Sequence, residues 1–325
     1  MLKLDLKDRK LLYELDIDSR QSYHQIAKKI GLSKDSVIYR INKLQEAGVI
    51  KQFHTIIDVS KLGFISFRLY IKLQNITPEK ENEIINFLKN QDVVTWIVSI
   101  DGEFDLGMWI LAKSTREMNN LWRDILKRYI NFIEKRWLTI FIKVSYYPRA
   151  YLLEKKYNTE EYVFISESEK IDIDKKDVEI LKILTPNSRI SILDMAKKLK
   201  ITTKTVTARI KELEKKKIIL GYRTMFDIEK LGYQYFKVHF NLHSLTNEKE
   251  KQFKAFIKQN PNIIYDSEVL GGDDIEIDVQ IRSIQELRSL LGEIKKQFAG
   301  IIKNYKYMLF YKEHKYIFFP LESFK

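Results

Sequence analysis

The spacing of apolar residues predicts two short helices joined by a tight turn near the start of the chain. In residues 33–47 apolar side chains recur at helical spacing, and basic and hydroxyl side chains occupy the other faces. Ser33 is a natural N-cap, and Gly48 can adopt the left-handed conformation that ends a helix. Residues 23–30 form a shorter amphipathic helix, which the turn at Gly31 joins to the second. This arrangement predicts a helix-turn-helix with its recognition helix at 33–47.

The same pattern returns 169 positions later. Residues 202–216 repeat the capped basic helix, with Val206, Ile210 and Leu213 facing inward as Val37, Ile41 and Leu44 do in the first copy. At this constant spacing Ser19-Arg20 pairs with Ser188-Arg189, and the register holds without a gap as far as Phe141 and Phe310. Chance does not hold one register over about 140 positions, so the chain is a tandem duplication of one unit.

After each helix-turn-helix the periodicity changes to that of strands. Residues 49–58 are predicted to form a small β-hairpin, which makes the first unit a winged helix. The pattern that follows predicts a β-α-β-β-α-β series, the ferredoxin-like arrangement with both helices on one face of an antiparallel sheet. The other face of this sheet is interpreted as apolar and in need of a partner. The predicted strands are 65–73, 94–101, 104–112 and 137–146, and the predicted helices are 78–90 and 115–129.

The predicted fold class is therefore α+β, with two winged helix-turn-helix domains alternating with two ferredoxin-like domains. A connector without a clean period separates the two copies. The predicted domains are 1–64 and 171–233 for the winged helices, 65–147 and 234–325 for the ferredoxin-like units, and 148–170 for the connector.

Composition narrows the class of partner. The 325 residues carry a net charge of +13, which suggests an anionic partner, nucleic acid first and a membrane surface second. There is no cysteine, which excludes disulfides and thiolate chemistry. The N-terminal segment is too polar for a signal peptide, and no apolar run approaches ~20 residues. We therefore expect a cytoplasmic protein without a membrane partner.

Both copies resemble the leucine-responsive regulatory protein (Lrp/AsnC) family of transcription regulators. The resemblance rests on SRQSYHQIAKKIGLSKDSVIYRINKLQEAGVIKQFHTIIDVSKLGF and SRISILDMAKKLKITTKTVTARIKELEKKKIILGYRTMFDIEKLGY, and on a Gly-x-x-Asp turn in IDGEFDLGMWI and LGGDDIEIDV. It implies double-stranded DNA as a partner and a small-molecule effector, usually an amino acid, bound near the Gly-x-x-Asp turn. It also implies two ferredoxin-like (RAM) sheets packed face to face. In a tandem chain we expect this contact within one molecule, which would then be a pseudo-dimer. Whether such chains assemble further into a homo-oligomer stays open.

Polar side chains of the two recognition helices are the candidates for DNA contact. Arg and Lys neutralise phosphates and read guanine edges, while Ser and Thr hydroxyls bond phosphate or base. The alternative is a solvated helix face, but basic residues recur at the same register in both helices, which favours DNA. We expect Arg40→Ala and Arg209→Ala to weaken DNA binding and to leave the fold intact. The candidates are Ser33, Lys34, Ser36, Tyr39, Arg40 and Lys43, and Thr202, Thr203, Lys204, Thr205, Arg209 and Lys211.

The two Gly-x-x-Asp turns are the candidate effector sites. Glycine lets the backbone come close to a ligand, and the aspartate can face an ammonium group. The alternative is a tight turn whose aspartate caps its own backbone. Phe104 offers an apolar wall where the second copy has Asp273, so an apolar amino acid should prefer the first site and a cationic one the second. The candidates are Gly102, Glu103, Phe104 and Asp105, and Gly271, Gly272, Asp273 and Asp274.

No catalytic residue, metal site or cofactor is predicted. His239 and His243 lie four apart on a predicted strand, but no third ligand is spaced to complete a metal site. Two alternatives to an effector-responsive regulator stay open. The sirohaem decarboxylases resemble this family in both domains, although residues 65–147 contain no histidine to transfer a proton. The high positive charge also suits an architectural, chromatin-like DNA-binding protein.

Overall fold

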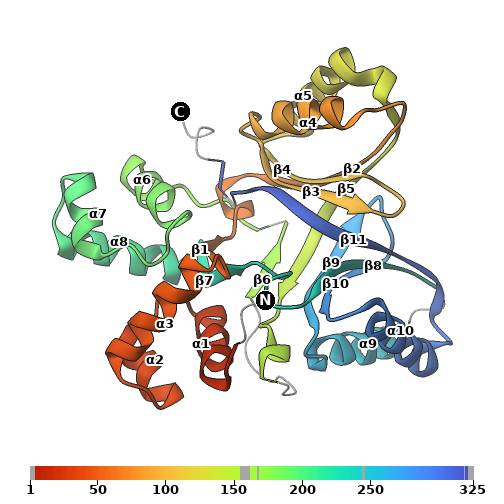
Figure 1. Ribbon diagram of the computed structural model, residues 1–325. Coiled ribbons are helices and arrows are strands. Elements are labelled where there is room, and N and C mark those ends of the chain that lie inside the picture. Colours follow the sequence, from red (N-terminus) through yellow and green to blue (C-terminus); the bar gives the residue numbers. More distant parts are fainter. Residues whose placement is uncertain (1–3, 154–161, 167, 244–245, 318, 321–325) are drawn as a thin grey trace.

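Each copy of the repeat folds into the same series of elements (Figure 1). The computed structural model describes residues 4–153, 162–166, 168–243, 246–317 and 319–320. The first copy consists of α1 (Leu6–Ile17), α2 (Tyr23–Ile30), α3 (Lys34–Glu46), β1 (Ile50–Ile57), η1 (Ser60–Leu62), β2 (Ile65–Leu73), α4 (Pro78–Lys89), β3 (Val94–Asp101), β4 (Leu106–Ala112), α5 (Thr115–Tyr129), η2 (Ile130–Phe132) and β5 (Ile133–Tyr146). The second copy consists of α6 (Lys175–Leu184), α7 (Ile192–Leu199), α8 (Thr203–Lys215), β7 (Ile219–Phe226), β8 (Gln234–Leu242), α9 (Asn247–Gln259), β9 (Ile263–Leu270), β10 (Ile275–Ile281), α10 (Ile284–Phe298) and β11 (Ile302–Tyr316). The predicted helix-turn-helix and β-α-β-β-α-β series are therefore confirmed.

The connector predicted at 148–170 contains a helical turn, η3 (Ala150–Leu152), and a short strand, β6 (Tyr162–Ile165). Strand β6 extends the sheet by pairing with the end of β5. Residues 154–161 and 167 of the predicted connector lie outside the described residues.

The predicted hairpin at residues 49–58 is wrong. One strand, β1, occupies this segment and pairs antiparallel with β7 of the second copy, so that the two copies share a two-stranded ribbon. A two-residue hairpin turn needs residues such as glycine or asparagine that adopt positive φ, and this segment has neither. The apolar strand therefore finds its partner in the other copy.

The shared ribbon also joins the two helix-turn-helix units through side chains. Thr55 Oγ1 donates a hydrogen bond to the Leu184 carbonyl at 2.8 Å, and Thr224 Oγ1 donates one to the Leu15 carbonyl at 2.7 Å. Phe226 of β7 belongs to the apolar core that encloses α1 to α3, while the end of β1 belongs to the core of α6 to α8. Each unit thus needs the other copy to complete its core.

The strands of the two ferredoxin-like units close into one ring. Within each unit the order is β5-β2-β4-β3 or β11-β8-β10-β9, and the units join antiparallel at β3–β11 and at β5–β9. The predicted contact between the two sheets is therefore present within one chain. Paired strand edges make it, and so do side chains of the facing sheets, such as Tyr70 and His239, whose ring centroids lie 5.9 Å apart. Helices α4 and α5 lie on one side of the ring, and α9 and α10 lie on the opposite side (Figure 1). In the part of the chain that the structure describes, no helix is both long enough and apolar enough to cross a membrane.

The face of the sheets inside the ring is apolar only in part: Val98, Ile100 and Met308 belong to a buried apolar cluster there, as predicted, but the second copy adds charged groups that were not predicted. Side chains alternate along a strand, so apolar residues of β8 such as Val238 pack beneath α9 and α10, and their neighbours point inward. Lys237 and His239 are fully buried inside the ring, together with Glu276 and Asp278 from β10. The ring interior therefore holds charged groups that must find partners within it.

Candidate nucleic-acid interface

Each recognition helix, α3 or α8, begins at its own hydroxyl cap. Ser33 accepts a hydrogen bond from the Ser36 N–H, and Thr202 accepts one from the Thr205 N–H, each at 3.1 Å. The two hydroxyls of each pair lie 2.9 Å apart. These four predicted contact residues thus fix the helix start, where free N–H groups and the positive end of the helix dipole can meet a phosphate.

A lysine of the opposite copy holds the C-terminal end of each recognition helix. Lys230 Nζ donates a hydrogen bond to the Ala47 carbonyl at 2.8 Å, and Lys61 Nζ donates one to the Lys216 carbonyl at 2.9 Å. The positive charge also suits the negative end of the helix dipole. Because both contacts cross between copies, they fix α3 and α8 relative to each other.

A pseudo-two-fold axis passes between the helix-turn-helix units at Ser19 and Ser188, whose hydroxyl oxygens lie 2.7 Å apart. Arg20 donates a hydrogen bond to the Ser188 carbonyl, and Arg189 donates one to the Ser19 carbonyl. The sequence had paired these residues by position but had assigned them no role. Their recurrence 169 positions apart was the sequence feature that could have predicted this reciprocal contact between the two units.

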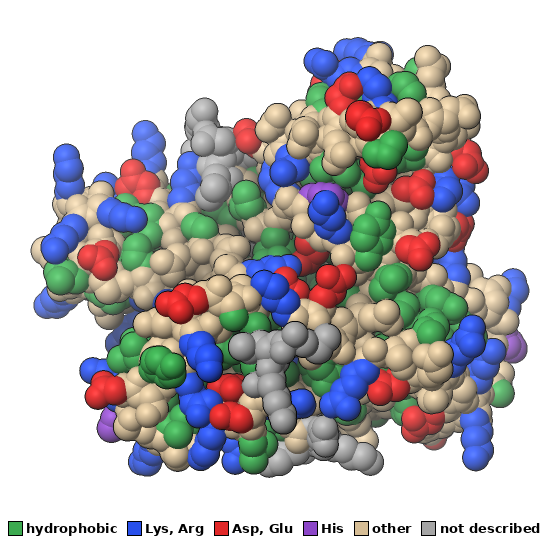
Figure 2. Space-filling view, in the orientation of Figure 1, with side chains coloured by type: hydrophobic (Ala, Val, Ile, Leu, Met, Phe, Trp, Pro, Cys, Tyr) green, Lys and Arg blue, Asp and Glu red, His purple; other side chains and the backbone are tan. Residues whose placement is uncertain are grey.

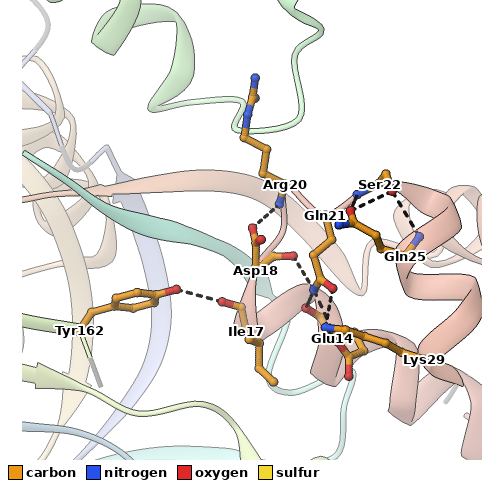
Figure 3. A network of polar contacts seen from close by, with 9 residues as sticks. All are labelled: Glu14, Ile17, Asp18, Arg20, Gln21, Ser22, Gln25, Lys29 and Tyr162. Atoms are coloured by element: carbon orange, nitrogen blue, oxygen red, sulfur yellow. Dashed lines mark hydrogen bonds and ion pairs between the residues drawn. The ribbon is translucent and has the colours of Figure 1, made fainter. Parts of the chain in front are cut away.

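Figure 3 shows how the loop after α1 is fixed so that Arg20 projects towards the second copy. The Arg20 N–H donates to Asp18 at 2.8 Å, and the Gln21 side chain donates to the Glu14 carbonyl at 2.9 Å. Lys29 donates hydrogen bonds to the Glu14 carboxylate and to the side-chain amide oxygen of Gln21, each at 2.7 Å. The reciprocal contact between the two units therefore rests on a rigid loop.

Arg40 and Arg209, predicted to contact DNA, bind the N-terminal helix of their own unit. Arg40 Nη1 lies 2.8 Å from Asp5 and 2.6 Å from Asp8, the two residues of the capping box of α1. Hydrogen bonds to Asp5 and Asp8 raise the pKa of Arg40. Arg209 makes the same pair of contacts, at 2.7 and 2.8 Å, with the equivalent aspartates. Both arginines therefore position the recognition helix, and the expectation that alanine leaves the fold intact does not match these contacts.

The outward faces of the two recognition helices differ in chemistry. On α8, Lys204 and Lys211 flank a shallow concavity, and on α3 the side chain of Tyr39 is 67% exposed. Figure 2 shows Lys and Arg side chains projecting from this part of the molecule. Thr207 and Ala208 also line the concavity, and sequence reasoning missed them because it sought only basic and capping residues. Their spacing of four from predicted contact residues was the available signal.

The aspartates of the two Gly-x-x-Asp turns tie each turn to a neighbouring strand. Asp105 accepts a hydrogen bond from the Leu73 N–H, and Asp274 accepts one from the Leu242 N–H, each at 2.6 Å. The second oxygen of Asp105 lies 2.7 Å from Lys72 Nζ. These carboxylates therefore have structural partners on the adjacent strand.

Other residues of the two turns meet over one end of the ring. Lys306 Nζ lies 3.3 Å from both Glu103 of the first turn and Asp273 of the second. Phe104 is buried and stacks on the ring of Tyr70, with the centroids 5.5 Å apart. Gly102, Gly271 and Gly272 are exposed beside this cluster. Sequence reasoning treated the turns as two separate sites and missed Lys306, because it comes from a distant strand.

The histidines form no metal centre in the part of the chain that the structure describes. There, no group of three or more His, Cys, Asp or Glu side chains is arranged to hold a metal ion. His239 is buried inside the ring, and His243 is exposed just beyond the end of β8.

Comparison with known proteins assigns the chain to a family. The AsnC-type helix-turn-helix domain matches residues 4–45, and a winged helix-turn-helix DNA-binding model matches residues 173–219. An uncharacterized HTH-type transcriptional regulator of Pyrococcus furiosus is 32% identical over 135 residues, which cover 41% of this chain and 88% of that protein. Transcriptional regulator AzlB of Bacillus subtilis is 33% identical over 128 residues, covering 38% of this chain and 80% of that protein. An HTH-type transcriptional regulator of Methanocaldococcus jannaschii is 35% identical over 131 residues, covering 39% and 85%.

The fold and its paired helix-turn-helix units define a DNA-binding transcription regulator. The chain belongs to the Lrp/AsnC family, in a form that carries two copies of the family unit. The relatives named above are transcriptional regulators. This assigns the chain to transcription regulation rather than to an enzyme activity.

The crystal structure of the siroheme decarboxylase NirDL resembles the whole chain. It matches with a TM-score of 0.63 over 96% of this chain and 93% of that chain, at 14% sequence identity. The same enzyme in complex with an iron-uroporphyrin III analogue matches with a TM-score of 0.62. At this identity the likeness shows the fold alone.

Arg40→Ala should lower the free energy of unfolding by about 1 kcal/mol, because it removes two ion pairs between α1 and α3. Lys43→Ala, on an exposed position of the same helix, should change it by less than about 0.5 kcal/mol. Urea denaturation of both variants measures the difference. An Arg40→Ala midpoint equal to that of Lys43→Ala would show that the arginine does not position the helix.

Proposed function

We propose that one chain binds double-stranded DNA with both recognition helices at once, in the cytoplasm, and that a small-molecule effector adjusts this binding. The observation that carries the proposal is the crosswise fixation of the two helix-turn-helix units. Ser19 meets Ser188 on the pseudo-two-fold axis, and lysines of each copy hold the recognition helix of the other. A rigid pair of recognition helices suits two half-sites in successive major grooves.

The proposed contact surface is the exposed face of each helix. Lys34, Tyr39 and Lys43 supply it on α3, and Lys204 and Lys211 supply it on α8. Phosphate contacts from the lysines set the affinity, while the uncharged side chains adjust which bases fit. Because Tyr39 stands where the second copy has Ala208, we infer two half-sites of different sequence.

The proposed effector site is the end of the ring where the two turns meet. Exposed backbone at Gly271 and Gly272 is available to a carboxylate. Glu103 is paired with Lys135 and Lys306, and an ammonium group of the ligand would replace one of these lysines. Lys306 links the first turn to the second, so a ligand that replaces this contact changes how the two copies hold each other. An amino acid carries both of the required groups, and we propose this class of effector.

Lys204→Ala and Lys211→Ala should each weaken DNA binding on every sequence and make its salt dependence shallower by about one unit of log-log slope. The physical reason is that a variant lacking one of these lysines neutralises one phosphate fewer and therefore releases fewer counterions from the duplex. Fluorescence anisotropy at several salt concentrations measures this slope. Lys127→Ala is the matched control, because Lys127 is exposed on α5, away from the recognition helices, and this change should leave the slope unchanged. Equal slopes for all three variants would place the DNA contact elsewhere.

One or more of the twenty amino acids should raise the melting temperature of the protein, because a ligand that binds only the folded state stabilises it. Glu103→Gln should reduce that shift by removing the carboxylate proposed to face the ammonium group. A thermal-shift screen of both proteins measures the effect. If no amino acid shifts the melt, or if Glu103→Gln leaves the shift intact, the turns serve only to join strands.

A further inference from the structure

The two copies neutralise equivalent buried cations differently. Lys237 of β8 is fully buried inside the ring, and its Nζ lies 2.8 Å from Glu276 and 2.7 Å from Asp278 of β10. The residue 169 positions earlier is Arg68 of β2, which also points into the ring. The duplication therefore offers a direct comparison of two cations in the same kind of place.

Arg68 lacks the two carboxylates that its counterpart has. The positions equivalent to them are occupied by Gly107 and Trp109. Its Nη1 donates to the Tyr70 hydroxyl at 2.8 Å, but its Nε is buried without an acceptor. Among the residues that the structure describes, no carboxylate lies within ion-pair distance of this guanidinium. Burial lowers the pKa of Arg68, but Tyr70 and the more distant carboxylates of Glu276 and Asp278 raise it on balance, so the guanidinium stays charged. Its Nε still lacks an acceptor, and this favours an anion that comes from outside the chain.

Arg68 lines a cavity at the end of the ring that faces the strand ribbon of the helix-turn-helix units. The cavity has a volume of about 60 Å³, and its walls include the aromatic rings of Trp96 and Tyr265. Two carboxylates also line it, but each has a partner: Asp278 pairs with Lys237, and Glu313 accepts a hydrogen bond from Trp96. The guanidinium carbon lies 4.7 Å from the ring centre of Phe141, which also lines the cavity. Because one water needs about 10–15 Å³, this space holds a molecule of roughly four to six non-hydrogen atoms.

We infer that this cavity is a binding site for a short-chain organic acid, whose carboxylate pairs with Arg68 and whose apolar body lies against the aromatic walls. A planar guanidinium presents two parallel N–H donors that match the two oxygens of a carboxylate. The aromatic rings give an apolar body a surface that an inorganic anion does not use. The site is separate from the proposed effector site at the turns, which lies at the other end of the ring.

The wall of the same cavity meets the first helix-turn-helix unit through polar contacts and the second through the apolar core. Arg149 forms part of its wall, and the Arg149 N–H donates to Asp16 of α1 at 2.7 Å. The Arg149 side chain also binds Asp16 and, at 3.0 Å, the side-chain oxygen of Gln280. The residue equivalent to Asp16 after α6 is Thr185, which has no carboxylate. Phe141 and Tyr146 of the wall pack in the apolar core of α6 to α8, but among the described contacts of Arg149 the polar path from the cavity leads to α1 and not to α6. A bound acid therefore acts more strongly on α1 than on α6.

The test is a titration of the DNA-free protein with sodium propionate, followed by tryptophan fluorescence, because Trp96 and Trp109 line the cavity. Propionamide has the same shape without the charge and should bind at least about tenfold more weakly. Arg68→Met should lose propionate binding to a similar extent. Arg136→Met is the matched control, since this arginine is exposed and stacks on Trp122, and it should bind propionate as the unmodified protein does.

Hydrogen exchange on the same samples tests the connection to α1. Propionate should slow exchange more in residues 6–17 than in residues 175–184. Equal binding of propionate and propionamide by the unmodified protein overturns the proposed carboxylate site, even if Arg68→Met does not fold. Protection that is equal in the two helices overturns the polar connection to α1. Since no DNA is present, neither result depends on the proposed DNA contacts.

Discussion

The pairing of strand edges between the two copies is the constraint on which the rest of the structure depends. A single ferredoxin-like sheet leaves two exposed edges, and exposed edges invite pairing with another chain. Here β3 pairs with β11 and β5 pairs with β9, so the second copy covers both edges of the first. The ribbon of β1 and β7 solves the same problem for the helix-turn-helix units. The positions of the recognition helices, the shared cores and the closed ring all follow from these pairings.

Duplication within one chain lets the two halves of a symmetric assembly diverge. In a homodimer every change appears twice, whereas here Arg68 stands opposite a fully paired Lys237, and Asp16 stands opposite Thr185. Divergence also carries a structural cost. Gly31 and Gly48 end α2 and α3 with positive φ, but Lys200 and Lys217 adopt positive φ, 53° and 56°, at the equivalent positions. A lysine in this region is strained because its Cβ approaches the backbone, so the second helix-turn-helix keeps the shape with less favourable residues.

The sequence predicted the elements well because helix and strand periodicities are local properties of the chain. It failed where the partner was distant: the apolar stretch ending at Ile57 fits either a hairpin or a strand paired across copies. The alternation of Lys237 and His239 with apolar neighbours indicated a polar interior. It was missed because the test for a proton-transferring histidine considered residues 65–147 alone, and His239 was weighed only as a metal ligand. The ring takes residues from both copies, so no single stretch reveals it. The ion pair of Arg40 with Asp8 was not predicted, because the spacing of Arg40 fits both a DNA contact and an ion pair.

The central claim is that one chain presents both recognition helices to one DNA site, and the stoichiometry of the complex tests it most directly. Native mass spectrometry on duplexes selected from a random library, combined with hydroxyl-radical footprinting, measures the chains bound and the half-sites protected. The account predicts one chain per duplex and two protected segments whose centres lie about one or two helical turns apart, at about 10 base pairs per turn. Two chains per duplex, each protecting a single segment, would contradict it.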